Sequence, residues 1–219
     1  MIIENYHEKS IQWEDKYTIA LLFGFNILLD KLNNLDILTY TTINETITSW
    51  LTEYGIKNKE IIKKHIIKVV KYANKIIPNT QPQYDEINNT INNDYQLLNV
   101  TTDYVRHKYI ELGLLEHNPR YSIESSDKFI QSIINNIETK IGLFATMSTM
   151  LAFSSFIFDN ALAQEYTEYK WRTQRDSKVR HTHAAMDNRW VKINGTPPHP
   201  VGCHVGEDYG CRCWAIEFR

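Results

Sequence analysis

The sequence predicts an α+β protein in which an N-terminal helical bundle precedes a small C-terminal module of short strands and one short helix. Only 8 glycines and 6 prolines occur in 219 residues, which favours long helices over a sandwich of short strands. Hydrophobic residues make up 42% of the chain, enough to build a core. After Tyr169 the pattern changes to short β-prone pieces between turns. We therefore expect a helical body over residues 1–165 and an α+β module over residues 166–219.

The first two helices are expected in the N-terminal quarter of the chain. Apolar residues at helical spacing predict a helix over Trp13–Leu32 (Leu21, Phe25, Leu28 and Leu32). Thr42 is expected to open the next helix, because Thr42 and Glu45 have the T-x-x-E spacing of a capping box. Gly55 is expected to end it.

Residues Asn58–Ile77 carry the clearest amphipathic pattern, and Pro78 is expected to stop this helix, with a connector over Pro78–Gln83. Its apolar stripe is Ile62, Ile66, Val69, Ala73 and Ile76. A second stripe is basic: Lys64, Lys68, Lys71 and Lys75. A solvated helix face and a surface that contacts nucleic acid or an acidic partner both account for this basic stripe.

Further helices are expected over residues 85–115 and from Ser125 or Ser126 onwards. The last one carries an isoleucine stripe through the apolar run Gly142–Phe158 towards Tyr166. That run is about 17 residues, shorter than the roughly 20 of a membrane span, and hydroxyl side chains interrupt it. We interpret it as a buried helix and expect no membrane contact. The N-terminus lacks a basic stretch followed by an apolar one, so no signal peptide is expected.

The C-terminal module concentrates the unusual residues of the chain. Strands are expected over Tyr169–Thr173, Arg189–Ile193 and Arg212–Phe218, with a short helix around Thr182–Asp187. All three cysteines and four of the eight histidines lie between Trp171 and Trp214. Any function that can be read from this sequence must therefore be read here.

Thiols and imidazoles in this module indicate a metal site as one interpretation. The candidate ligands, which are of the soft and borderline types that zinc prefers, are Cys203, His204, Cys211, Cys213 and His183. In a strand, the C-x-C spacing would place the thiols of Cys211 and Cys213 on one face. A disulfide that includes Cys203, and plain packing of small buried residues, remain open as alternatives.

Acid–base catalysis is a second interpretation of the same module. His183 and His204 are of the type that serves as general acid and base. Arg180 and Arg212 are suited to hold an anion such as phosphate, and Asp187 to orient an imidazole. Asp176 and Asp208 are further candidates for that orienting role. A tightly hydrogen-bonded small fold needs the same residues, so a structural role remains equally open. A cysteine nucleophile is a third, weaker interpretation.

Two segments of this module resemble a known family. The first reads WRTQRDSKVRHTHAAMD from Trp171 to Asp187, and the second reads HVGEDYGCRCWA from His204 to Ala215. In this order they resemble the C-terminal domain of the phage Mu F-like, or head-morphogenesis, minor head proteins. The resemblance covers residues 165 to 217. Its pattern falls on Trp171, Asp176, Arg180, His183, Asp187, His204, Gly206, Asp208, Cys211, Arg212 and Cys213. We call these two segments the first and second islands.

The resemblance implies a helical region before the module and a few-copy protein inside the phage head. This chain departs from the family in three places. Asn188 stands where the family has glycine, although asparagine tolerates the left-handed conformation that such a turn needs. No Arg-Thr-Glu triplet precedes the module. The segment Thr196–Cys203 adds His199 and Cys203, which the pattern does not require.

Two function classes follow from these observations. The first is a phage or prophage minor head protein, structural rather than catalytic, with the portal or capsid protein as partner and DNA contact through the lysine stripe. It would reside in the bacterial cytoplasm and then in the virion. The alternative is a secreted bacterial toxin or effector with a nuclease-like C-terminal module and a cognate immunity protein. Zinc is the one cofactor that the residues suggest, and reduced thiols are expected if the protein resides in the bacterial cytoplasm.

Overall fold

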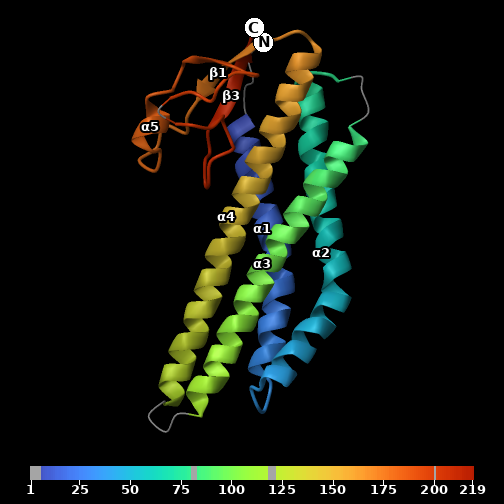
Figure 1. The fold of residues 1–219 in the computed structure, drawn as a ribbon, viewed down its shortest axis with the longest axis vertical. Coiled ribbons are helices and arrows are strands. Elements are labelled where there is room, and N and C mark those ends of the chain that lie inside the picture. Colours follow the sequence, from blue (N-terminus) through green and yellow to red (C-terminus); the bar gives the residue numbers. More distant parts are fainter. Residues whose placement is uncertain (1–5, 80–82, 118–121, 200) are drawn as a thin grey trace. The chain divides into compact units, whose positions relative to one another are not determined.

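The computed structural model describes residues 6–79, 83–117, 122–199 and 201–219, and it confirms the predicted α+β fold (Figure 1). Four long helices come first: α1 (Tyr6–Asn33), α2 (Tyr40–Ile76), α3 (Tyr84–Glu116) and α4 (Ile123–Ala163). The module follows with β1 (Glu168–Arg172), α5 (His181–Ala184), β2 (Trp190–Lys192) and β3 (Trp214–Phe218). Residues 80–82 of the expected connector lie outside the described residues.

Helix α2 is one continuous helix, so the prediction that Gly55 ends a helix is wrong. A Cβ on Gly55 would lie 2.9 Å from the hydroxyl oxygen of Tyr95 in α3. Glycine serves here to admit a close neighbour rather than to stop the helix. The predicted apolar stripe over Asn58–Ile77 ends at Ile76. In the structure Ile77 is fully buried and Ile76 only half-buried, so the buried stripe ends at Ile77 instead.

The N-terminal cap of α2 lies three residues before the predicted position, and that of α4 lies three or four residues before it. The hydroxyl of Thr39 accepts from the backbone N–H of Thr42 at 3.1 Å, and that of Thr42 accepts from the N–H of Thr39 at 3.0 Å. This reciprocal pair is the capping box, not Thr42 with Glu45. At α4, Ser122 accepts from the N–H of Ser125 at 3.2 Å, so Ser122 is the cap.

Helix α4 is long and apolar enough to cross a membrane, by length and composition alone. Of its most apolar stretch, 61% is buried inside the protein, as in the core helix of a folded domain. The interpretation of Gly142–Phe158 as a buried helix is favoured by this burial and stays a prediction.

The long helices contribute to two compact units. The first unit comprises the described residues of Met1–Asp15, Lys64–Thr90 and Ala145–Arg219, and the second comprises Lys16–Lys63 and Ile91–Phe144. The C-terminal module thus shares a unit with segments of α1, α2, α3 and α4. The domain boundary at residue 165 stays a prediction.

A polar hub joins three segments within the first unit. The buried side chain of Asn160 donates to Oδ1 of Asn74 at 2.6 Å and to the carbonyl oxygen of Ile77 at 2.7 Å. Its own oxygen accepts from Gln83 at 3.2 Å. Asn160 therefore satisfies a carbonyl that the end of α2 leaves unpaired and ties α4 to the start of α3. In the second unit, the buried indole of Trp50 donates to the carbonyl of Gly24 at 2.9 Å.

The module is built on a three-stranded antiparallel sheet in the order β2-β1-β3. Strand β1 is central: Tyr169 pairs with Val191 of β2 on one side and with Phe218 of β3 on the other. Tyr169 and Trp171 of β1 are fully buried. The three strands lie within one or two residues of their predicted positions, and α5 begins one residue before its predicted start and ends three residues before its predicted end.

Candidate metal centre

The first island folds back on itself through a tight turn after α5. Asn188 adopts the left-handed conformation (φ +66°) that its position was expected to need, and its N–H donates to the carbonyl of Trp171 at 2.8 Å. The carboxylate of Asp187 accepts from the N–H of Thr173 at 2.9 Å and from Nε of Arg175 at 2.9 Å. Asp187 therefore holds the loop that leads to α5, which is a structural role.

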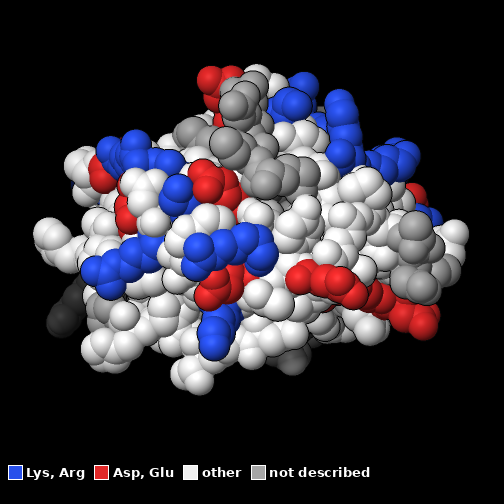
Figure 2. All heavy atoms as spheres, turned by 90° about the horizontal axis from the view of Figure 1, so that it is seen from above, with Lys and Arg blue, Asp and Glu red and all other residues white. Residues whose placement is uncertain are grey.

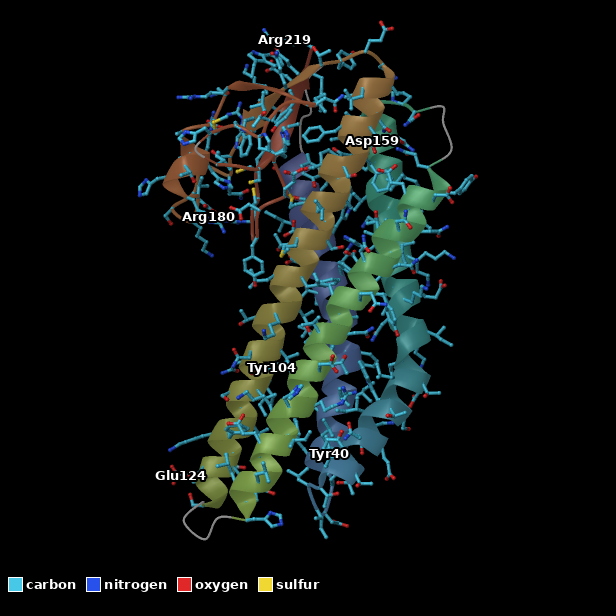
Figure 3. The ribbon with its side chains drawn as sticks, in the orientation of Figure 1. Tyr40, Tyr104, Glu124, Asp159, Arg180 and Arg219 are labelled. Atoms are coloured by element: carbon cyan, nitrogen blue, oxygen red, sulfur yellow. The ribbon has the colours of Figure 1, made fainter. Side chains whose placement is uncertain are left out.

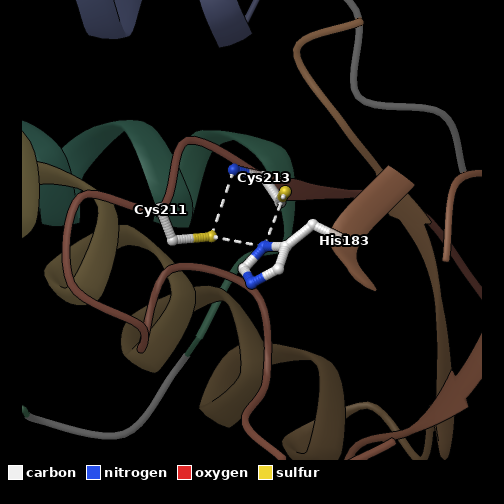
Figure 4. A group of neighbouring side chains, drawn as sticks. All are labelled: His183, Cys211 and Cys213. Atoms are coloured by element: carbon white, nitrogen blue, oxygen red, sulfur yellow. Dashed lines mark hydrogen bonds between the residues drawn. The ribbon is translucent and has the colours of Figure 1, made fainter. Parts of the chain in front are cut away.

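His183 of α5 meets the two thiols of the second island (Figure 4). Its Nδ1 lies 3.6 Å from Sγ of Cys211 and 3.5 Å from Sγ of Cys213. All three side chains are buried. The cysteines precede β3, so strand alternation is not what brings the thiols together. The loop does so instead, with the N–H of Cys213 donating to Sγ of Cys211 at 3.4 Å.

The opposite edge of the His183 ring faces a carboxylate. Its Nε2 lies 3.2 Å from Oδ2 of Asp208, which also pairs with Arg180. The edge of the Trp171 indole packs on the imidazole, with ring centroids 5.8 Å apart. The ring is thus held from three sides, by a carboxylate, the Trp171 indole and the thiol pair.

The two thiols and the imidazole perturb one another because they lie so close. Hydrogen bonding from the Cys213 thiol, together with His183, lowers the pKa of Cys211 against the effect of burial. The same contact raises the pKa of Cys213, and burial adds to this rise. Hydrogen bonding to Cys211 raises the pKa of His183. These opposite directions favour the thiolate on Cys211 rather than on Cys213.

Cys203 also lies close to His183. It forms a second group with His183 and Asp208 whose potential ligand atoms all lie within 4.8 Å of one another. Burial, and then the charge of Asp208, raise the pKa of its thiol to about 11. All three cysteines are free, so no disulfide links Cys203 to the thiol pair.

His204 does not join the cluster. Its Nδ1 lies 3.2 Å from the hydroxyl of Tyr169, and its ring packs edge-on against Phe158 with centroids 6.1 Å apart. It lines a separate cavity of about 240 Å³ together with Glu207. Asp159 of α4, which is labelled in Figure 3, lines the same cavity. The structure therefore does not bring His183 and His204 together as a general acid and base.

A small cavity of about 70 Å³ opens beside the thiol pair. Its lining includes His183, both cysteines and the cationic residues Lys178, Arg180 and Arg212. Arg180 lies at the start of α5 (Figure 3), and Arg212 pairs with Asp176 at 2.7 Å. The cavity is thus polar, and cationic side chains line it next to the two thiols.

The predicted lysine stripe is exposed along α2, with Lys64, Lys68, Lys71 and Lys75 all at the surface. Lys68 also lies over the Trp13 ring, 5.0 Å from its centroid. Elsewhere the charges are mixed: Figure 2 shows basic and acidic side chains next to each other on much of the face that it draws.

Of the residues predicted for a site, the structure brings together Arg180, His183, Cys211, Arg212 and Cys213 around one cavity. Cys203 and Asp208 form a second group with His183. The structure places His204 and Asp187 apart from these groups. Sequence reasoning missed Tyr169 and Lys178. The hydroxyl of Tyr169 contacts Nδ1 of His204, which lies 35 positions later in the chain, and no sequence spacing predicts such a pair.

No protein-family model matches the chain, no curated protein matches it, and no solved structure matches its fold. The resemblance of the two islands to the Mu F-like minor head proteins therefore remains a prediction.

Proposed function

We propose that this chain is a phage or prophage minor head protein that acts as a structural component at the portal or capsid. The observation that supports this best is the meeting of the two islands, in which His183 of the first contacts Cys211 and Cys213 of the second. A resemblance carried by two separated segments gains weight when those segments build one site. The helical bundle before the module also agrees with what the resemblance implies.

A structural role is favoured over catalysis because the predicted acid–base set is dispersed. His204 is engaged with Tyr169, and the carboxylate of Asp187 is occupied by Thr173 and Arg175. A catalytic pair needs both groups within hydrogen-bond reach of one substrate position. Of the predicted set, only Arg180, His183 and Arg212 share a cavity.

Co-purification with the portal protein tests the proposal. The full chain, tagged, is co-expressed with the portal protein encoded beside it and, separately, with a portal protein of an unrelated phage as control. Capture of the neighbouring portal protein alone, in near-physiological salt, is the expected result. Equal capture of both, or of neither, would contradict the assignment to head assembly.

DNA contact through the lysine stripe is the second part of the proposal. Lys64→Glu with Lys71→Glu is expected to weaken binding to duplex DNA and to flatten its salt dependence, because fewer phosphate counterions are released. Lys59→Glu with Lys63→Glu, which reverses two exposed lysines of the same helix outside the stripe, is the matched control. An identical loss in both variants would remove the stripe from the proposal.

The alternative function is a toxin or secreted effector with a nuclease-like module and an immunity protein as partner. The cationic cavity that includes His183 favours it. Expression of the full chain in a bacterial host would then slow growth, and His183→Ala would relieve the effect. Normal growth, with no nuclease activity in divalent metal ions, would exclude this alternative.

A further inference from the structure

We propose that the C-terminal module binds one zinc ion through Cys211, Cys213 and Nδ1 of His183, with the fourth coordination position open to the adjoining cavity. This inference goes beyond a role in head assembly and does not depend on it. It follows from distances, charge and the surroundings of the three side chains.

The spacing of the three side chains already suits a tetrahedral ion. With Zn–S about 2.3 Å and Zn–N about 2.0–2.1 Å, a sulfur and a nitrogen ligand lie about 3.6 Å apart at the tetrahedral angle. The separations of Nδ1 from the two sulfurs are 3.6 and 3.5 Å. The three potential ligand atoms all lie within 4.8 Å of one another. An ion can therefore enter without a large rearrangement of the backbone.

Charge balance favours a divalent ion in this buried place. The exposed fractions of Cys211, Cys213 and His183 are 4%, 3% and 3%. Two thiolates and a neutral imidazole cancel the charge of Zn²⁺, so the loaded cluster is neutral and its burial is not penalised as an isolated charge would be. The backbone N–H groups of Cys213 and Gly206 point to Sγ of Cys211 and stabilise negative charge on it.

The surroundings of His183 prepare its Nδ1 as a ligand. With Oδ2 of Asp208 3.2 Å away, Nε2 is the nitrogen that carries the proton and donates it to the carboxylate. The lone pair then lies on Nδ1, which faces the two thiols. A carboxylate behind a histidine in this way orients the ring and increases its basicity towards a metal.

A competing ligand set consists of His183, Cys203 and Asp208. That set would use Nε2, and it has one thiol where the other has two. Asp208 is also already paired with Arg180. Zinc prefers the set with more thiolate ligands, so we assign the ion to Nδ1 and the thiol pair.

The fourth position faces the cavity of about 70 Å³, which His183, Cys211 and Cys213 all line. This volume holds a water molecule or a small anion. Of the cationic side chains in the same lining, Arg180 and Arg212 are paired with Asp208 and Asp176, and Lys178 favours an anion. Three protein ligands and one exchangeable position distinguish this site from a closed structural zinc site, which has four protein ligands.

Metal content and ligand substitution test the ligand set. The full chain, purified under reducing conditions without chelator, is expected to hold one equivalent of zinc. Cys211→Ser and Cys213→Ser are expected to lower zinc affinity at least about 100-fold, more than the loss of an outer-shell partner does. Cys203→Ser is the matched control and is expected to retain the metal. Far-ultraviolet circular dichroism establishes that each variant keeps its helices.

Three results would overturn the assignment. One is a clearly substoichiometric zinc content that does not rise when zinc is added to the reduced wild-type chain. Another is a loss of zinc from Cys203→Ser equal to that from Cys211→Ser, which would place the ion in the competing set. The third is full zinc retention in Cys211→Ser. Because the first test uses the wild-type chain, unfolding of a variant does not leave the proposal untested.

Cobalt substitution tests the open position. Co²⁺ bound to two thiolates gives a charge-transfer band, and its visible spectrum reports the coordination geometry. Addition of inorganic phosphate is expected to change that visible spectrum in the wild-type chain and to change it less in Lys178→Ala. A spectrum that phosphate does not alter would show a closed fourth position.

Discussion

Nε2 of His183 lies 3.2 Å from Oδ2 of Asp208, on the edge of the imidazole ring opposite the two thiols. The two ring nitrogens therefore have different neighbours: Nε2 faces the carboxylate, and Nδ1 faces the thiols of Cys211 and Cys213. The orientation of the ring, and not only its presence, therefore depends on Asp208.

Asp208→Asn is accordingly expected to lower zinc affinity by about 10–100-fold, because the amide orients the imidazole less firmly and does not increase its basicity. Competition with a chromogenic chelator measures the change. Asp176→Asn is the matched control, since it also removes a carboxylate paired with an arginine but does not contact His183. Equal losses in the two variants would show that Asp208 acts through general electrostatics and not through the ring.

Gly206 of the second island is expected to be harder to replace than Gly202, which lies just before the island. Its φ is +81°, and a Cβ there would lie 2.6 Å from Oγ of Ser154 and 2.8 Å from the carbonyl oxygen of Met150 in α4. Gly202 also has a positive φ, +76°, but a Cβ there would meet nothing within 4 Å. Gly202→Ala should therefore cost only the conformational strain, about 1–2 kcal/mol. Gly206→Ala should cost about 1–3 kcal/mol more, because α4 must shift.

Urea unfolding of the two glycine variants measures the difference. It isolates the close approach between the second island and α4, since both variants carry the same backbone strain. Equal stabilities of the two variants would mean that Gly206 lies farther from α4 than in the structure.

The raised pKa of Glu14 predicts how the free energy of unfolding changes with pH. Burial raises its pKa to about 7 from an ordinary value of 4.5, although its carboxylate accepts a hydrogen bond from Thr146 at 3.0 Å. Between these two pH values folding takes up a proton, so the contribution of Glu14 to stability falls as pH rises, by about 3 kcal/mol at most. Glu14→Gln is expected to remove this part of the decline, whereas the part from Glu86, whose pKa burial also raises to about 7, is expected to remain.

Urea unfolding of wild type and Glu14→Gln across pH 4.5 to 7 provides the check. Glu8→Gln, which removes an exposed carboxylate of α1, is expected to leave the decline in place. A decline of the same size in Glu14→Gln would assign it to another group.

The capping box of α2 gives a prediction for the second unit. Thr39→Ala removes the hydroxyl that accepts from the N–H of Thr42, and it should cost about 1 kcal/mol. Glu45→Ala, at the exposed position that the sequence pattern favoured, should change stability by no more than about 0.5 kcal/mol. Thermal unfolding distinguishes the two, and a larger loss in Glu45→Ala would contradict the assigned cap.

Periodicity in the sequence predicts most of the fold because helix formation and strand alternation are local. The long helices, three short strands and α5 lie close to their expected places for this reason. The Gly55 prediction fails since the contact that explains this glycine comes from Tyr95, 40 positions away. The predicted caps of α2 and α4 are misplaced by three or four residues because several threonines or serines at each start have suitable spacing, and only the backbone geometry selects one.

The sequence predicts which types of residue form the site, but it does not predict which individual residues come together. The cysteine and histidine content of the islands identifies the ligands that are chemically suited to zinc. Which histidine meets the thiols depends on long-range packing: Trp171 and Asp208 hold His183 in place, whereas Tyr169 and Phe158 hold His204 away. No local pattern distinguishes these two rings.

The central position of β1 has a consequence for synthesis on the ribosome. β1 is made early in the module but pairs on both sides, with β2 and with β3, and the thiols lie just before β3. A nascent chain in which β3 is still inside the exit tunnel therefore exposes one edge of β1, and the two thiols are not yet available to His183.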